Sequence, residues 1–349
     1  MIAHNIYIHV PFCVSKCNYC AFFSRAVAPD WESYLGGICQ EIDFWATKLG
    51  QFYVPTVFFG GGTPSLMPIN VFDKIMQHLR KNFDSSGCCE ITLESNPGTI
   101  TPEKLRDFIS CGITRLSIGI QSLNDDELIF LGRRHDVKTA LNLLDAAQKT
   151  NVEISADFIY GMPNHGVKNI VSMCNQINNL GLNHVSLYEL TIEKNTPFGH
   201  MNLRMPTNEE MADMYIAIQN NLNLSRYEVS NYAMPGHECK HNQNIWDGGA
   251  YIGIGHGAMG RVFMDDTWYE QSGGDIQYSA ISNDVRATEK IITGLRTTRG
   301  VAMTPDIQNV LDINFINSHN ALVQIKNNRL CATDQGMMIL DDLLVNITR

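Results

Sequence analysis

Three cysteines lie close together near the start of the chain, at Cys13, Cys17 and Cys20. An iron–sulfur cluster needs thiolates that converge on a small cube, and one loop with short spacings can wrap it. Three cysteines bind three irons and leave a fourth iron open to a cofactor. The spacing therefore predicts a [4Fe–4S] cluster. The alternatives are a chance cluster and a structural zinc site completed by His4 or His9, although no second cysteine pair follows.

Glycines and polar residues follow several short β-rich runs. Gly61, Gly62 and Thr63 come after one run. Glu94 and Asp157 stand at the ends of two others. Glycines let a backbone approach a ligand closely, and a carboxylate can accept two hydrogen bonds from a ribose diol. Functional residues of α/β barrels gather where strands end, so we expect these groups on one rim. Taken singly, the glycines could form a plain tight turn and Glu94 could be a solvated loop residue.

The elements that would position these residues alternate along the first two thirds of the chain. Predicted strands cover Asn5–His9, Thr56–Phe59, Glu90–Ser95, Arg115–Gly119, Glu153–Asp157 and His184–Tyr188. Predicted helices cover Trp31–Leu49, Ile69–Asn82, Thr101–Ser110, Val137–Thr150 and Val167–Leu180. Strands separated by helices of this length form βαβ units with a parallel sheet. Six such units predict an α/β fold with a partial (β/α)6 barrel like that of a TIM barrel.

The pattern changes after about residue 207. A helix is expected over Asn208–Leu224, and short strands over Tyr227–Val229 and Ala250–Ile254 flank a polar stretch. From Ala287 to Arg349 the chain alternates between helices and short strands. We therefore expect a barrel domain at 1–220, an extension of it at 221–285, and a smaller α+β module at 286–349.

Composition narrows the class of protein. With 349 residues and 44% hydrophobic residues, the chain can bury a sizeable core. Its net charge of −10 and its lack of a Lys/Arg cluster disfavour nucleic-acid partners. The other seven cysteines are dispersed, unlike those of a secreted disulfide scaffold. We find no signal peptide and no apolar run long enough to span a membrane. A cytoplasmic protein is expected.

The cysteine motif supports a resemblance. CxxxCxxC, preceded by a strand and followed by an aromatic residue, resembles the radical S-adenosylmethionine (SAM) superfamily. Tyr7-Ile8-His9-Val10-Pro11-Phe12-Cys13 with Cys17-Asn18-Tyr19-Cys20 is similar to the HemN/HemW family, and the similarity runs to about Leu344. This family includes oxygen-independent coproporphyrinogen III oxidase and a related haem chaperone. The resemblance implies that the open iron chelates SAM and that an electron donor reduces the cluster.

The same resemblance assigns further residues to SAM. It places Gly61, Gly62 and Thr63 near the amino group and Glu94 on the ribose. It adds Gln121, Arg133 and Asp157 as SAM contacts, and Tyr7 and Tyr19 as aromatic groups around the cluster and the adenine. Each of these could singly be a surface or strand-end residue, and Tyr19 could equally be a core aromatic.

Two departures separate the branches of the family. Phe22 stands where the oxidase carries a further cysteine, and the first strand begins without the oxidase's long N-terminal extension. Both favour the chaperone branch. His241 to Trp246 is similar to the chaperone motif H-N-x-x-Y-W, with Ile245 in place of tyrosine. This implies a haem ligand at His241 and a stacking ring at Trp246 within 221–285; an ordinary hydrogen-bonded histidine is the alternative.

A second family segment, rich in glycine, holds His256 and Met259, which could also ligate iron or simply form a turn. The resemblance thus implies a haem chaperone that binds haem as cargo and delivers it to an acceptor haem protein, and leaves enzyme activity open. The alternative is an oxidase that decarboxylates coproporphyrinogen III to protoporphyrinogen IX in porphyrin biosynthesis. Radical modification of RNA is a third option, which the acidic balance disfavours.

Overall fold

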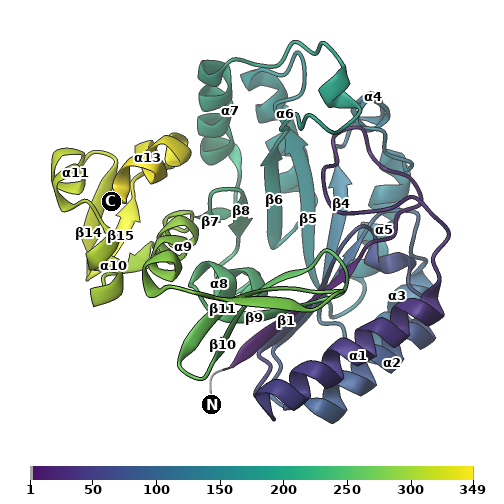
Figure 1. Cartoon of the computed structure of the whole chain (residues 1–349). Coiled ribbons are helices and arrows are strands. Elements are labelled where there is room, and N and C mark those ends of the chain that lie inside the picture. The colour runs from purple at the N-terminus through teal and green to yellow at the C-terminus, as the bar shows by residue number, and fades with distance from the viewer. Residues whose placement is uncertain (1–2, 349) are drawn as a thin grey trace.

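The computed structural model describes residues 3–348, so the outermost residues of the predicted first and last segments (1–2 and 349) lie outside it. A 12-stranded sheet forms the centre of the molecule (Figure 1). Its middle is β1 (His4–Val10), β2 (Thr56–Gly61), β3 (Glu90–Ser95), β4 (Arg115–Gln121), β5 (Glu153–Tyr160) and β6 (His184–Glu189). These six strands pair in parallel and in chain order. The predicted partial barrel is confirmed.

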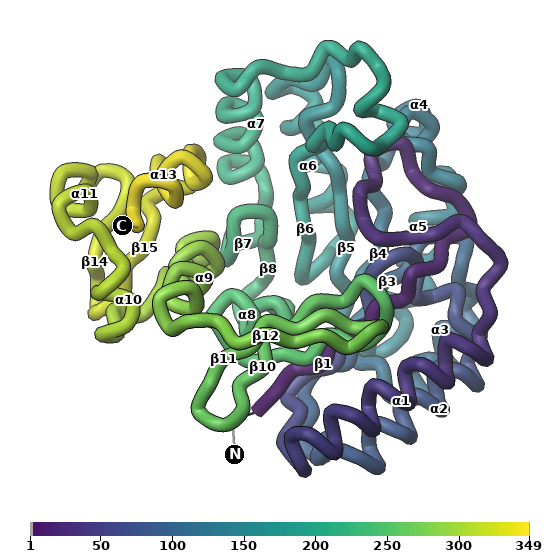
Figure 2. The backbone as a smooth tube through the Cα atoms, viewed as in Figure 1, coloured from purple at the N-terminus to yellow at the C-terminus, as the bar shows by residue number. Residues whose placement is uncertain are grey.

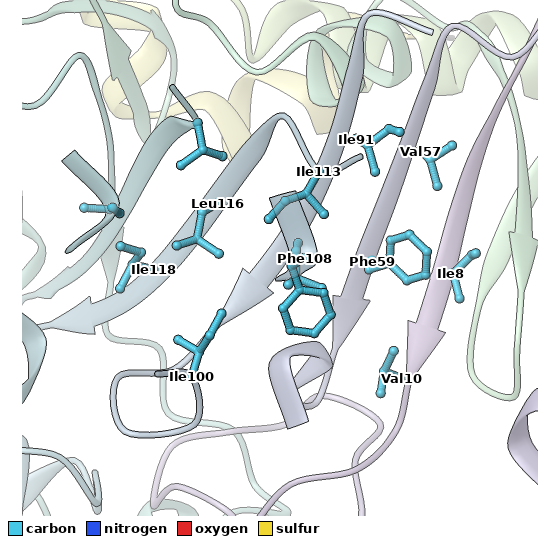
Figure 3. Close-up of a cluster of buried hydrophobic side chains, with 14 of the residues drawn as sticks. Ile8, Val10, Val57, Phe59, Ile91, Ile100, Phe108, Ile113, Leu116 and Ile118 are labelled. Atoms are coloured by element: carbon cyan, nitrogen blue, oxygen red, sulfur yellow. The ribbon is translucent and has the colours of Figure 1, made fainter. Parts of the chain in front are cut away.

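Helices cover the outer face of these strands. They are α1 (Trp31–Leu49), α2 (Ile69–Asn82), α3 (Pro102–Cys111), α5 (Val137–Gln148) and α6 (Val167–Asn179), with the short α4 (Asp125–Phe130) and the 3-10 turns η1 (Pro64–Leu66) and η2 (Phe198–His200) between them and α7 (Asn208–Asn221) after them. Apolar side chains at alternate strand positions, such as Ile8, Phe59 and Leu116, pack under the helices (Figure 3). Burial of this face holds the helices on the sheet.

Local signals determine where α3 begins and ends. The Thr101 side chain accepts a hydrogen bond from the Lys104 N–H, and Pro102 occupies the first helical position. Gly112 ends the helix at φ 115°, a conformation that side chains disfavour. Both signals are visible in the sequence, as Thr101-Pro102 before the helix and Gly112 directly after it.

The sheet extends beyond the parallel strands on both sides. At one side β9 (Ala250–Ile254) pairs in parallel with β1, and β10 (Met259–Met264), β11 (Thr267–Ser272) and β12 (Gln277–Ile281) follow as antiparallel strands. At the other side β8 (Asn231–Ala233) and β7 (Ser225–Glu228) complete the order. The two predicted short strands are present as β7 and β9, whereas β8, β10, β11 and β12 were not predicted. The strands β11 and β12 lie at the edge and carry mostly half-buried or exposed side chains, so they lack a buried apolar run.

The C-terminal segment builds a second core. It contains α9 (Asn283–Leu295), β13 (Val301–Ala302), α10 (Pro305–Val310), α11 (Ile313–Ser318), β14 (Val323–Lys326), β15 (Arg329–Ala332), α12 (Asp334–Met338) and α13 (Leu340–Ile347). Residues from Ala287 to Ile347 pack together separately from the barrel core, and Figure 2 shows this module beside α7 and β7. The predicted boundaries at 220 and 285 stay predictions. Within residues 3–348, no helix is both long and apolar enough to cross a lipid bilayer.

Candidate functional site

The cysteine loop follows β1 at the end of the barrel where the six parallel strands end, which we call the rim. Cys13, Cys17 and Cys20 line one cavity of about 460 Å³. The loop is held by backbone hydrogen bonds from the Cys13 N–H to the Arg25 carbonyl oxygen (3.0 Å) and from the Asn18 N–H to the Leu131 carbonyl oxygen after α4 (3.0 Å). All three thiols are free and half-buried. A loop of this kind can present three thiolates to one bound group.

The donor set fits a cube better than a single ion. Among the described residues no three His, Cys, Asp or Glu side chains are arranged around one metal position. Thiolates that each bind a different iron lie farther apart than the ligands of one zinc ion. The His9 ring contacts Tyr7 Oη (3.0 Å) and the Phe23 carbonyl oxygen (2.8 Å), so neither nitrogen is available to complete a zinc site. Arg133 Nη1 donates a hydrogen bond to Cys17 Sγ (3.5 Å).

The glycine loop after β2 passes directly against the cysteine loop. A Cβ added to Gly62 would lie 2.7 Å from the Phe12 carbonyl oxygen and 3.0 Å from Cys13 Sγ. Gly61 has φ 115°, and a Cβ there would lie 2.6 Å from the His9 ring. Only glycine fits this close approach, because any side chain would overlap the neighbouring segment. The next residue, Thr63, places its Oγ1 3.5 Å from Cys13 Sγ.

Two carboxyl groups face the same cavity from β3 and β5. Glu94 Oε2 accepts a hydrogen bond from the Gly61 N–H (3.1 Å), and Asp157 Oδ2 accepts one from Ser117 Oγ (3.0 Å). Burial, with the nearby Asp157 carboxylate, raises the pKa of Glu94 to about 8. Burial also raises the pKa of Asp157 to about 6. A ligand that brings hydroxyl donors or a positive charge would stabilise both carboxylates.

Two polar side chains and an aromatic ring complete the predicted set on this wall. Arg133 Nη2 donates to the Gly119 carbonyl oxygen (2.8 Å) and to Asn96 Oδ1. Gln121 ends β4 with φ 71° and lines the cavity, as does Tyr19, whose phenol pKa is raised by burial. The cavity thus brings together all the residues predicted to contact SAM except Tyr7.

Tyr7 instead lines a second cavity deeper in the barrel. This cavity measures about 270 Å³ and shares Glu94, Ser117, Asp157 and Tyr188 with the first. Its remaining lining includes polar side chains from inward positions of β3 to β6 (Thr92, Arg115, Ser155, His184, Ser186). Branched apolar side chains normally fill such a barrel, so this interior is polar space below the rim cavity.

Sequence reasoning missed several residues of the rim cavity. Asn96, Ser117, Tyr188 and Glu189 also line it. The signal for Ser117 and Tyr188 is alternation, because every second residue of a strand faces the same side. Asn96 stands two residues after Glu94 in the same segment, and that position is the signal that could have identified it.

At the opposite end, where the six strands begin, α8 (Lys240–Trp246) forms what we call the floor. Glu90 accepts hydrogen bonds from the His241 N–H (2.9 Å) and the Lys240 N–H (3.2 Å). Arg115 Nε donates to the same carboxylate (2.9 Å), and both charged side chains are about 3–4% exposed. Arg115 Nη2 also donates to the Glu238 carbonyl oxygen (3.2 Å) just before the helix. This buried network holds α8 in place.

The two residues predicted to contact haem lie on different sides of α8. His241 is 2% exposed and lines the deep cavity. Burial lowers the pKa of its ring to about 4, so the ring is neutral near pH 7. Trp246 does not line that cavity and packs against Tyr227, with ring centres 6.0 Å apart. The structure therefore does not bring the pair into one site, and their haem roles stay predictions.

Of the second pair of candidate haem residues, His256 lies on a turn near the cysteine loop and Met259 begins β10. His256 and Met259 are both exposed. The His256 ring contacts the Phe23 ring at 4.9 Å between centres. The neighbouring Phe22 side chain is 70% exposed and lines the rim cavity.

Comparison with known proteins agrees with this geometry. Residues 7–177 match the Radical SAM superfamily. The protein named heme chaperone HemW from Haemophilus influenzae is 35% identical over 268 residues, which cover 74% of this chain and 70% of that protein. The chain belongs to the HemW family of radical SAM proteins. HemW of Escherichia coli is 33% identical over 300 residues, covering 82% of this chain and 79% of the relative.

A solved structure shows the same fold. Coproporphyrinogen III oxidase (HemN) from Escherichia coli superimposes with a TM-score of 0.81 over 99% of this chain and 89% of that one, at 19% sequence identity. At that identity the likeness concerns the fold. Membership of the radical SAM superfamily implies a [4Fe–4S] cluster and SAM as cofactors, as the resemblance had predicted.

Proposed function

We propose that this protein binds haem and passes it to an acceptor haem protein, and that its cluster and SAM govern the transfer. The observation that carries the proposal is Phe22, an exposed phenyl ring on the rim cavity at the place where the oxidase has a further cysteine. The relatives named heme chaperone support the same choice. The ten free cysteines fit a cytoplasmic location.

In this proposal Cys13, Cys17 and Cys20 hold the cluster. When bound, the cluster supplies an open iron for SAM and takes an electron from a donor protein. Arg133 Nη1 holds the Cys17 side chain by a hydrogen bond to Sγ (3.5 Å), and Glu94 accepts hydrogen bonds from the ribose diol of SAM.

The remaining SAM contacts come from the walls of the same cavity. Asp157 and Gln121 contact other parts of SAM. Gly61, Gly62 and Thr63 let its amino group approach the backbone. Tyr7, whose hydroxyl contacts His9 below this cavity, would act from the deep cavity.

The haem site has two candidates that differ in access. His241 is enclosed, and its cavity of about 270 Å³ is smaller than the ~300–1,000 Å³ typical of ligand pockets. Haem would reach His241 only if this cavity widened, and Trp246, which packs against Tyr227 instead, would reach the haem only after a further movement. His256 and Met259 already face solvent and need no such movement.

Anaerobic haem titration of the cluster-loaded protein tests the proposal. We expect saturable binding by the wild type and a loss of affinity of at least tenfold in His241→Ala. His200→Ala, at an exposed histidine of η2, is the matched control and should bind normally. A loss in His256→Ala instead would move the site to the exposed turn. No binding by the wild type would refute the chaperone function.

The deep cavity favours one competing function. It adjoins the rim cavity through four shared residues and offers room for a substrate group beside SAM. Coproporphyrinogen III, SAM and a reductant should give no protoporphyrinogen IX if the chaperone proposal is right. Turnover would make the protein an oxidase and would show that Phe22 does not exclude that activity.

A further inference from the structure

The floor of the barrel fixes the orientation of one buried amide. Asn5 Nδ2 donates to the Ala250 carbonyl oxygen (3.2 Å) on β9. Its Oδ1 therefore faces the interior, where it accepts hydrogen bonds from Thr56 Oγ1 (2.8 Å) and from Asn244 Nδ2 (3.3 Å) on α8. Asn5 and Thr56 are both fully or almost fully buried, at 3% and 0% exposed. Water is therefore not needed to satisfy this amide.

The amide in turn fixes the hydroxyl of Thr56. Because the Thr56 proton points to Asn5 Oδ1, the hydroxyl oxygen is left as an acceptor on its other side. That oxygen lies 2.8 Å from His241 Nδ1. A neutral imidazole has one N–H and one bare nitrogen, so Nδ1 carries the proton and donates it to Thr56. His241 Nε2 is then the bare nitrogen.

The bare nitrogen has no partner in the described part of the chain. His241 Nε2 is buried and makes no hydrogen bond, although its residue lines the deep cavity. A buried acceptor without a partner is unfavourable, because it has lost its hydrogen bonds to water. The Phe58 ring lies 5.0 Å from the imidazole, and Glu90 holds the His241 backbone, so the ring cannot easily turn to find another partner.

We propose that Asn5 and Thr56 are positioning residues that hold His241 in the Nδ1-protonated tautomer and present Nε2 as a ligand-ready lone pair in the barrel. A metal-binding imidazole has this form, with its other nitrogen donating to a fixed acceptor. On the proposed function, which this inference deepens, the atom that Nε2 receives is haem iron.

Two substitutions at Thr56 test the inference. Thr56→Val keeps the shape of the side chain and removes the hydroxyl, whereas Thr56→Ser keeps the hydroxyl. Nitrogen-15 NMR of histidine-labelled, cluster-loaded protein reads the tautomer directly, and the His241 signals are identified by their absence from His241→Gln. The expected wild-type ring is protonated at Nδ1. Thr56→Ser should keep that state, and Thr56→Val should shift the ring toward protonation at Nε2. A wild-type ring protonated at Nε2, or an unchanged tautomer in Thr56→Val, would overturn the inference.

Haem titration then separates this inference from the proposed function. Loss of the partner of a ligating histidine typically lowers metal affinity 10–100-fold. We expect that loss in Thr56→Val, near-normal affinity in Thr56→Ser, and unchanged cluster absorbance and circular dichroism in both. Wild-type haem affinity in Thr56→Val would overturn the positioning role. If the wild type bound no haem, the chaperone function would fail, whereas the NMR result would still decide the tautomer.

Discussion

The two ends of the barrel are built on different principles. At the rim, half-buried thiols from a loop, two carboxyl groups from β3 and β5, and Arg133 surround a cavity of about 460 Å³. At the floor, the Glu90–Arg115 ion pair is almost fully buried and bonded to backbone groups of α8. The rim groups therefore face open space that a cofactor could fill, whereas the charged floor groups are bonded to one another and to the backbone. Substitutions at the rim should therefore mainly change cofactor binding, and substitutions at the floor should mainly change the free energy of unfolding.

The largest expected effect lies at the rim. Cys17→Ser should abolish assembly of the cluster and weaken SAM binding at least 100-fold, because SAM would lose its open iron. Iron and sulfide analysis, visible absorbance and equilibrium dialysis measure this. Cys89→Ser, at an exposed cysteine, is the control and should keep cluster and SAM. A full cluster in Cys17→Ser would refute the ligand assignment.

The next effect lies at the floor. Glu90→Gln should lower the free energy of unfolding by about 3–5 kcal/mol, because it leaves the Arg115 guanidinium buried without a counter-charge. Glu103→Gln, which breaks a fully exposed pair with Arg106, should leave the free energy of unfolding almost unchanged. Urea titration compares the two. If both variants lost the same small amount of unfolding free energy, the Glu90–Arg115 pair would not stabilise the floor.

The rim should respond to pH. The folded protein holds a proton on Glu94 up to pH about 8, whereas an ordinary glutamate releases it near 4.5. Folding is therefore favoured by this group at low pH, and the contribution is lost as pH rises toward 8. From pH 6 to 8.5 the SAM-free protein should lose roughly 2–3 kcal/mol of unfolding free energy.

Glu94→Gln separates this group from others that titrate in the same range. The amide stays neutral at every pH, so urea titration of the variant should show a much smaller loss between pH 6 and 8.5. Glu103→Gln should keep the wild-type pH dependence. An equal loss in Glu94→Gln and the wild type would assign the effect to other groups.

The difference between rim and floor also explains what the sequence could predict. The parallel strands could be predicted because each buries an apolar face under helices. The rim residues could be predicted because they stand at the ends of these strands. The roles of these residues stay predictions, but their clustering was foreseen. Tyr7 lies on β1 and lines the deep cavity rather than the rim cavity, and its predicted place around the cluster and the adenine stays a prediction.

The floor was harder to predict, because it depends on contacts between distant segments. Glu90 and Arg115 begin two strands, and their structural role is visible only in the fold, where they pair with each other and Glu90 binds the backbone of α8. The sides of α8 were foreseeable. His241 and Trp246 are five residues apart, and at 3.6 residues per turn their side chains point about 140° apart. A helix over 240–246 thus already argues against one shared haem face.

The smallest effect concerns the outer layer that both ends share. The helix α3 starts after β3 at the rim and ends near the floor, where a Cβ on Gly112 would meet Arg80 Nη2 at 2.6 Å. Thr101→Ala removes its N-cap and should cost about 1 kcal/mol of unfolding free energy, measured by urea titration. Thr101→Ser should restore it. Cluster content and haem affinity should not change, because α3 supports the sheet from outside. A change in either would mean that α3 also helps to shape the binding sites inside the barrel.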